Sequence, residues 1–157
     1  MIKKKRALFI SSSGGHLTQL LQLEALFSLY ETLLITEKND VTKEMKSKYK
    51  IKYVIYSSRN QKLLMPFTFL LLCMKSLLIF IFHRPSIVIT TGAGTAIPLC
   101  YIAKLFRKKV VYIETFSRIT SQSLSGKLAY KIADLFIVQW EEMLKFYPKA
   151  LYFGSIY

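Results

Sequence analysis

The sequence is poor in cysteine and in acidic residues, and each shortage narrows the class of protein. Its 157 residues include only two cysteines, Cys73 and Cys100, and both lie in apolar surroundings. Two cysteines supply neither a disulfide framework nor a cysteine metal set, so we expect buried thiols in a reducing compartment. Nine acidic residues stand against 23 Lys and Arg, a formal net charge of +14. This charge attracts polyanions (nucleic acid, anionic lipid headgroups or phosphorylated substrates), unless the lysines serve solubility alone.

Several common enzyme motifs are also absent. No G-x-G-x-x-G follows the first apolar run, although Glu37 stands where a dinucleotide-binding acid belongs. There is no P-loop, no G-x-S-x-G and no spaced set of metal ligands, so we expect no metal site. No nucleic-acid motif accompanies the charge, and we expect no nucleic-acid partner. The basic run Lys3–Arg6 precedes only four apolar residues, too few for a secretory signal, which favours a cytoplasmic location.

Apolar runs alternate between strand and helix patterns along the whole chain. With 52% hydrophobic residues, residues 1–157 can bury the core of one domain. Alternation at this spacing predicts an α/β fold, a Rossmann-like doubly wound parallel sheet. We expect strands at residues 7–11, 32–36, 51–56, 86–91, 110–114, 135–139 and 150–153, and helices at 17–29, 41–48, 63–82, 96–106, 124–133 and 140–146.

Residues 63–82 form a run of bilayer length that is apolar except at Thr68, Lys75 and Ser76. Pro66 is expected to start the helix and so to shorten the run. Lys75 at mid-membrane would cost about 2.5–3.5 kcal/mol, and a span would place strands of one sheet on opposite sides of the membrane. We therefore interpret this segment as a crossover helix with one face on the sheet and the other facing the membrane interface or a partner protein. A fully buried core helix is the alternative.

Small and polar residues gather where the predicted strands end. Ser11–His16, Gly92–Thr95, Glu114–Arg118 and Gln139–Glu141 all follow strands. Parallel strands with right-handed crossovers bring these loops to one edge of the sheet. Glycines there let a phosphate or a sugar approach the backbone closely, although each loop on its own is also compatible with a plain turn.

Four motifs in this order resemble the family of asparagine-linked glycosylation protein fourteen and its bacterial polysaccharide-biosynthesis relatives. They are Ser12–Leu17, Thr91–Thr95, Ile113–Arg118 and Ala133–Glu141. That family is similar to the acceptor-binding, N-terminal half of GT-B glycosyltransferases such as the peptidoglycan enzyme MurG. The resemblance implies half of a GT-B enzyme, because this sequence has neither the donor-binding domain of MurG nor the N-terminal membrane anchor of the eukaryotic subunit.

The resemblance also implies partners and an activity. A donor-binding glycosyltransferase subunit would bind most of the UDP-sugar, and this chain would bind no cofactor of its own. This chain would bind a polyprenyl-diphosphate-linked sugar, peripherally on the anionic cytoplasmic face of the cell membrane. The pair would be an inverting glycosyltransferase that adds the next sugar in capsular or exopolysaccharide repeat-unit synthesis, with little or no activity in this chain alone. A non-catalytic scaffold that recruits and activates the partner is the alternative.

Roles for individual residues follow from the resemblance and from the chemistry of the side chains. His16 is the candidate general base, unless it only bonds the local backbone at a helix start. Glu114 is the alternative base or a sugar-hydroxyl acceptor, unless it is a structural carboxylate bonded to nearby N–H groups. The residues expected to bind the acceptor or its phosphates are Ser13, Gly14, Gly15, Gly92, Gly94, Thr95 and Arg118, the last of which is alternatively an exposed loop arginine.

Overall fold

The structure is a computed structural model that describes residues 4–55 and 64–156. Within this part of the chain, seven parallel strands form one sheet in the order β3-β2-β1-β4-β5-β6-β7. The strands are β1 (Arg6–Ile10), β2 (Glu31–Glu37), β3 (Ile51–Val54), β4 (Ile87–Thr90), β5 (Lys109–Ile113), β6 (Leu135–Val138) and β7 (Leu151–Tyr152). All seven predicted strands are confirmed, with ends that differ by at most two residues where the structure describes them.

The sheet changes direction beside β1. The chain first builds outward through β2 and β3, then returns to place β4 on the other side of β1, with Ala7 opposite both Thr32 and Ile87. Ligand sites of doubly wound folds lie at such a switch point, at the carboxyl ends of the strands. The loops that follow β1 and β4 flank this position.

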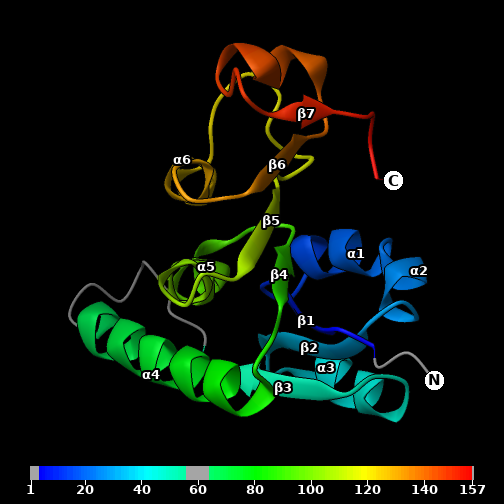
Figure 1. Cartoon of the computed structure of the whole chain (residues 1–157), viewed down its shortest axis with the longest axis vertical. Coiled ribbons are helices and arrows are strands. Elements are labelled where there is room, and N and C mark those ends of the chain that lie inside the picture. The colour runs from blue at the N-terminus through cyan, green and yellow to red at the C-terminus, as the bar shows by residue number, and fades with distance from the viewer. Residues whose placement is uncertain (1–3, 56–63, 157) are drawn as a thin grey trace.

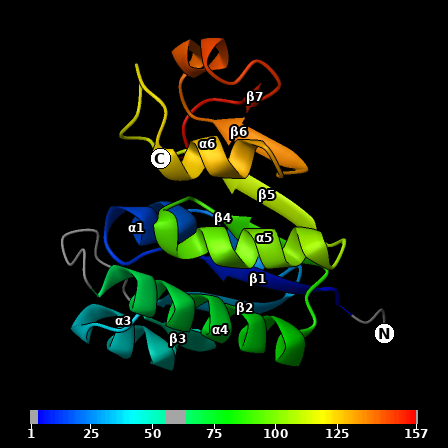
Figure 2. The ribbon, with the colours of Figure 1, turned by 90° about the vertical axis from the view of Figure 1, so that its left-hand side faces the viewer.

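Helices cover both faces of the sheet, which confirms the doubly wound architecture (Figures 1 and 2). One face carries α1 (Gly15–Leu21), α2 (Glu24–Phe27) and α3 (Asp40–Glu44), and the other carries α4 (Met65–His83), α5 (Ile97–Leu105) and α6 (Leu124–Tyr130). Short 3-10 turns complete the chain: η1 (Met45–Ser47), η2 (Gly94–Ala96) and η3 (Glu141–Lys145).

Two helix predictions need correction. The helix expected over 17–29 breaks after Leu21, because Leu23 leaves the helical region at φ −86° and ψ 13° before α2 begins. Because of this break, the Phe27 ring packs edge to face against the ring of Phe9 in β1, with ring centroids 4.5 Å apart. The segment expected to form a helix over 140–146 is the 3-10 turn η3 instead. Residues 56 and 63, expected at the ends of a strand and a helix, lie outside the described residues.

Alternate residues of the central strands fill two apolar cores. Leu8 and Ile10 of β1 pack with α4 and α5, whereas Phe9 packs with α1 and α2. Burial raises the pKa of the Cys100 thiol, which faces the first core, to about 12. Both cysteines are free thiols, but Cys73 is only half-buried, so the expectation that both are buried was wrong for Cys73. Cys73 lies on α4, which buries only one narrow stripe.

Helix α4 exposes most of its apolar surface. Its buried positions are Leu72, Ser76 and Phe80, a single stripe four residues apart. The fully buried alternative was therefore wrong. The helix is long and apolar enough to cross a membrane by length and composition. It cannot do so in this fold, because β1 and β4, before and after it in the chain, pair directly. Its exposed apolar residues are Met65, Phe67, Phe69, Leu70, Met74, Leu77, Leu78, Ile81 and Phe82.

Candidate functional site

The loop between β1 and α1 presents open backbone at the carboxyl edge of the sheet. Gly14 adopts a φ of +82°, a region that favours glycine, and it provides no side-chain cap for α1. A Cβ added at Gly14 or Gly15 would meet nothing within 4 Å. Space is thus free directly above this turn, and the two glycines leave the main chain accessible to a ligand.

His16, at the start of α1, is tied to the loop after β4. Its Nδ1 lies 2.9 Å from the carbonyl oxygen of Thr91, and the Thr91 hydroxyl donates to the carbonyl oxygen of His16 at 2.7 Å. A carbonyl only accepts, so Nδ1 carries the proton and the neutral ring keeps the lone pair of Nε2 for another partner. The half-buried ring is therefore oriented as a proton acceptor. The backbone that the ring bonds belongs to the loop after β4 and not to the start of its own helix, so the contact differs from the local bond considered for His16 as an alternative.

The loop after β4 is constrained around this ring. Gly92 has a φ of +102°, and a Cβ there would lie 2.9 Å from the Tyr112 hydroxyl and 3.5 Å from His16 Nδ1. A side chain there would strain the backbone and displace the Tyr112 hydroxyl, whereas the imidazole would lie at ordinary contact distance. Ala93, the next residue, has a φ of +74°, which costs a non-glycine residue about 1–3 kcal/mol. Such local strain is typical of backbone held in place for a ligand.

Glu37, at the end of β2, joins the two glycine loops. Its carboxylate is 5% exposed and accepts bonds from the Ser13 N–H at 3.2 Å, the Ser13 hydroxyl at 2.9 Å and the Thr95 hydroxyl at 2.7 Å. The hydroxyl hydrogens of Ser13 and Thr95 both point at the carboxylate. The hydroxyl oxygens of these two residues therefore remain available to accept hydrogen bonds from a ligand's own hydroxyls. Ser13 and Thr95 are thus brought together as predicted, through a carboxylate whose role the sequence did not reveal.

An open hollow of about 480 Å³ lies beside this carboxylate. It is lined by Ser12, Ser13, Glu37 and Lys38. Lys38, which is exposed, supplies a positive charge next to Glu37 and was also missed. Their position in the sequence could have revealed both residues. Glu37 ends a parallel strand and Lys38 directly follows it, at the edge of the sheet where ligand sites lie.

Glu114, by contrast, faces inward. It is 1% exposed, and its carboxylate accepts from the Thr115 N–H at 2.9 Å, the Ser123 hydroxyl at 2.8 Å and the Tyr147 hydroxyl at 2.6 Å. Burial, together with the bond to this carboxylate, raises the pKa of Tyr147 above its ordinary value. The enclosure favours the structural role over that of a base, because the hydrogen-bonding capacity of the carboxylate is largely used within the fold.

Arg118 and Gly94 complete the predicted set. The exposed Arg118 guanidinium donates to the Ser121 hydroxyl at 3.0 Å, within its own loop. The structure thus does not bring Arg118 to the glycine loops by any described contact. Gly94 begins η2 and, with Thr95, borders an apolar hollow of about 180 Å³. The hollow's other lining residues come from α4, α5 and α6: Met65, Phe69, Leu72, Ile97, Leu124, Ser125 and Leu128.

A buried amide pair, also missed from the sequence, connects α1 to the far strands. The Gln139 amide donates to the Gln19 side-chain oxygen and to the Glu114 carbonyl, both at 2.9 Å. Gln19 in turn accepts from the Phe116 N–H at 3.3 Å. These bonds fix the helix that carries His16 against the loop after β5. Among residues 4–55 and 64–156, no group of three or more His, Cys, Asp or Glu side chains is arranged to hold a metal ion.

The strand order and the carboxyl-edge loops define a Rossmann-like α/β domain of the kind found in GT-B glycosyltransferases and related epimerases. MurG of Acinetobacter baumannii superposes with a TM-score of 0.71 at 14% identity, over 88% of this chain and 42% of that one. The S. aureus MnaA–UDP structure gives a TM-score of 0.73 at 15% identity, over 97% and 44%. These likenesses establish the fold.

The chain belongs to the family described as "Oligosaccharide biosynthesis protein Alg14 like", which matches residues 7–156. The human UDP-N-acetylglucosamine transferase subunit ALG14 is 31% identical over 176 residues, which cover 95% of this chain and 82% of the human protein. The Candida albicans protein of the same name is 39% identical over 80 residues, 47% of this chain. That match spans 36% of the Candida protein's length.

Proposed function

We propose that this chain is the acceptor-binding subunit of a membrane-associated, two-component glycosyltransferase. A polyprenyl-diphosphate-linked sugar binds at the carboxyl edge of the sheet, a partner subunit binds the UDP-sugar, and the pair adds the next sugar of a capsular or exopolysaccharide repeat unit. The observation that carries the proposal is the His16 ring, held by Thr91 beside an open glycine turn. The names of the human and Candida relatives make UDP-N-acetylglucosamine the first donor to test.

His16 is the general base in this proposal. As the acceptor hydroxyl attacks the anomeric carbon of the donor sugar, its proton passes to Nε2 of His16. The new glycosidic bond forms as the bond between the anomeric carbon and the UDP oxygen breaks, UDP leaves with that electron pair, and the configuration inverts. The resulting imidazolium is stabilised by the Thr91 carbonyl, because a hydrogen bond from a charged donor is stronger than one from a neutral donor.

The acceptor is held by the surrounding loops. Main-chain groups at Gly14, Gly15, Gly92 and Gly94 bind the diphosphate or the sugar, with Lys38 and, after a loop movement, Arg118 as cationic partners. The oxygens of Ser13 and Thr95 accept from sugar hydroxyls, since their hydrogens are directed to Glu37. Glu114 stabilises the loop after β5 from inside the fold. It remains the alternative base.

Helix α4 and the charge of the chain support a peripheral position on the cytoplasmic face of the membrane. The exposed apolar side chains of α4 enter the membrane interface, and the net charge of +14 is attracted to anionic lipid. The apolar hollow between α4 and Gly94 offers the first isoprene units a path from the membrane to the diphosphate site.

Reconstituted transfer tests the catalytic assignment. In membranes that contain both subunits, the lipid-linked sugar and the UDP-sugar, His16→Ala is expected to lower kcat about 10²–10⁴-fold, the usual contribution of a general base. Gln22→Ala is the matched control, because Gln22 is an exposed residue at the other end of α1. Undiminished transfer by the double variant His16→Ala/Glu114→Ala would refute catalysis by this chain.

A non-catalytic scaffold that recruits and activates the partner is the second candidate. It is favoured by the exposed apolar end of the sheet, where Leu151, Tyr152 and Phe153 lie uncovered at β7. The same reconstitution separates the two functions. If the partner alone reaches the full transfer rate at saturating acceptor, this chain acts as a helper only.

A further inference from the structure

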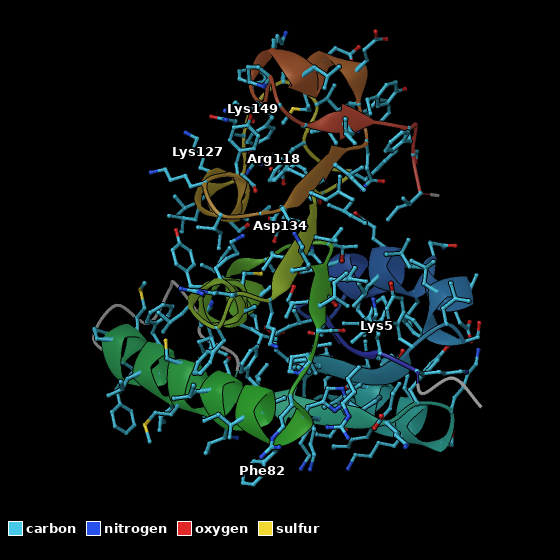
Figure 3. All side chains as sticks on the ribbon, viewed as in Figure 1. Lys5, Phe82, Arg118, Lys127, Asp134 and Lys149 are labelled. Carbon is cyan, nitrogen blue, oxygen red and sulfur yellow. The ribbon has the colours of Figure 1, made fainter. Side chains whose placement is uncertain are left out.

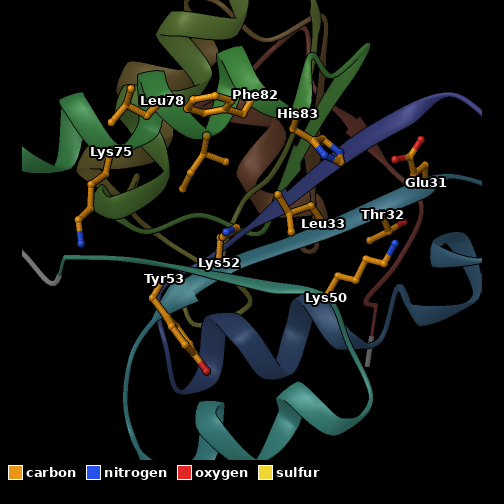
Figure 4. Close-up of a pocket in the computed structure, with 11 residues that line it drawn as sticks. Glu31, Thr32, Leu33, Lys50, Lys52, Tyr53, Lys75, Leu78, Phe82 and His83 are labelled. Carbon is orange, nitrogen blue, oxygen red and sulfur yellow. The ribbon is translucent and has the colours of Figure 1, made fainter.

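A trough with one apolar and one cationic wall lies under the C-terminal half of α4, away from the site described above. Its volume is about 540 Å³. Figure 4 shows Leu78 and Phe82 on the α4 side and Lys50 and Lys52 on the β3 side, with Leu33 between them. Phe82 is 80% exposed and projects outward from the end of α4 (Figure 3).

The trough exists because β3 and the residue before it present lysines, Lys52 and Lys50, where a core strand would present apolar side chains. Successive residues of a strand point to opposite faces. Val54 belongs to the core beneath α4 and α5, so Lys52 and Lys50 share its face. The two exposed ammonium groups replace the apolar side chains that would otherwise fill the space between α4 and the sheet.

The cationic wall is only partly balanced by its own lining, because the Glu31 carboxylate interacts electrostatically with Lys50. Lys75 of α4 also lines the trough, at the end away from Lys50 (Figure 4). Glu31 is the carboxylate among the described lining residues, and it is already paired with Arg6 at 3.2 Å. In the described part of the chain, Lys50, Lys52 and Lys75 form no ion pair. Three positive charges next to an apolar wall are complementary to an anion that carries hydrocarbon.

We propose that this trough binds the phosphodiester headgroup of an anionic phospholipid. The phosphate lies among Lys50, Lys52 and Lys75, and the glycerol and the first acyl carbons lie along Leu78 and Phe82. The trough opens beside the exposed apolar side chains of α4, so a lipid bound in it also lies at the membrane surface. The physiological role rests on the peripheral membrane position proposed for α4, but binding of a soluble lipid does not.

This headgroup site is distinct from the acceptor site. The trough begins at Glu31, the first residue of β2, and runs along β3 to Tyr53, whereas Glu37, the last residue of β2, lies at the carboxyl edge with the glycine loops. Among the described residues, none that lines the trough also lines the hollow beside Glu37. Helix α4 connects the two regions, with Met65 and Phe69 near Gly94 and Phe82 at the trough. A lipid bound at the trough therefore fixes the rotation of the domain on the membrane and turns the acceptor loops toward the lipid surface.

Titration of the purified chain with dihexanoyl phosphatidylglycerol, below its critical micelle concentration, tests the site without a membrane. We expect saturable binding that Lys50→Gln/Lys52→Gln/Lys75→Gln weakens at least 10-fold, because each lysine near an anionic headgroup is worth about 1 kcal/mol. Lys127→Gln/Lys131→Gln/Lys149→Gln removes the same charge from exposed positions in the α6–η3 half of the molecule and is expected to bind as the parent does (Figure 3). Equal weakening by both triple variants would overturn the proposal.

Further probes define the ligand class. Dihexanoyl phosphatidylcholine and inorganic phosphate are expected to bind at least 10-fold more weakly, the first because its net charge is zero and the second because it lacks hydrocarbon. Binding of either with the affinity of the phosphatidylglycerol would contradict an anionic-lipid site.

Vesicles separate this proposal from the membrane role of α4. Phe67→Ser/Leu70→Ser, at the other end of α4, is expected to reduce binding to phosphatidylcholine–phosphatidylglycerol vesicles and to leave dihexanoyl phosphatidylglycerol binding unchanged. If the parent protein binds the soluble lipid but not vesicles, the membrane position is refuted and the trough stands. If it binds vesicles but not the soluble lipid, the trough is refuted and the membrane position stands.

Discussion

His16 and Thr91 hold each other through two reciprocal hydrogen bonds, from ring nitrogen to carbonyl at 2.9 Å and from hydroxyl to carbonyl at 2.7 Å. The pair joins the loops after β1 and β4, 75 positions apart in the chain, at the switch point of the sheet. One bond fixes the ring and the other fixes the backbone that carries it.

The Thr91 hydroxyl is expected to matter for rate more than for stability. Thr91→Val removes the bond to the His16 carbonyl and keeps the shape, so we expect a stability loss of about 1 kcal/mol. In the reconstituted system kcat falls while KM stays constant, because the imidazole is displaced. Thr32→Val is the control, since Thr32 also donates to a backbone carbonyl, that of Phe27 at 3.1 Å. Equal kcat in the two variants would contradict a positioning role for Thr91.

Glu37 is expected to stabilise both glycine loops. Glu37→Ala leaves three donors without their acceptor, so we expect a loss of about 1–3 kcal/mol in the free energy of unfolding, measured by urea denaturation. Glu37→Gln retains one acceptor oxygen and costs less. Glu44→Gln, at an exposed position, is expected to change little. If Ser13→Ala/Thr95→Ala and Glu37→Ala have additive effects, the three side chains do not act as one unit.

Gly126 is expected to tolerate no side chain. A Cβ there would lie 1.9 Å from Glu114 Oε2 and 2.4 Å from the Tyr147 hydroxyl. Gly126→Ala is thus expected to destabilise the fold by about 1–3 kcal/mol, although alanine favours a helix. Gly15→Ala, in the first turn of α1 with nothing within 4 Å, is expected to be neutral or slightly stabilising. Similar melting temperatures for the two variants would show that the Glu114 enclosure is looser than its geometry indicates.

Asp134 is expected to make the stability of the fold depend on pH, with lower stability in acid. Burial alone raises its pKa, but the Val110 N–H, Lys104 and Lys109 outweigh burial and hold the pKa below its ordinary value. A carboxylate with a depressed pKa stabilises the fold above its unfolded pKa of about 4, and this contribution is lost as the pH falls through the lower folded value. Asp134→Asn is therefore expected to lower the urea midpoint at neutral pH and to match the parent at strongly acidic pH. A constant difference at all pH values would contradict this account.

The sequence by itself determined the sheet and the edge at which the site lies. Apolar runs and strand-end residues are local signals, because a buried parallel strand needs a continuous apolar run and the glycine turn needs residues without side chains. The position of His16 after β1 and the uncovered apolar face of α4 could therefore be predicted.

Only the tertiary structure decided which polar groups meet. Glu37 bonds Thr95 across 58 positions, and Gln139 bonds Gln19 across 120. These pairs depend on strand order and register, which no local pattern specifies. The same holds for the enclosure of Glu114 and for the trough, which arises because α4 passes over Lys50 and Lys52. The sequence states the type of each side chain. Its hydrogen-bond partner depends on the crossover connections that bring distant residues to one edge of the sheet.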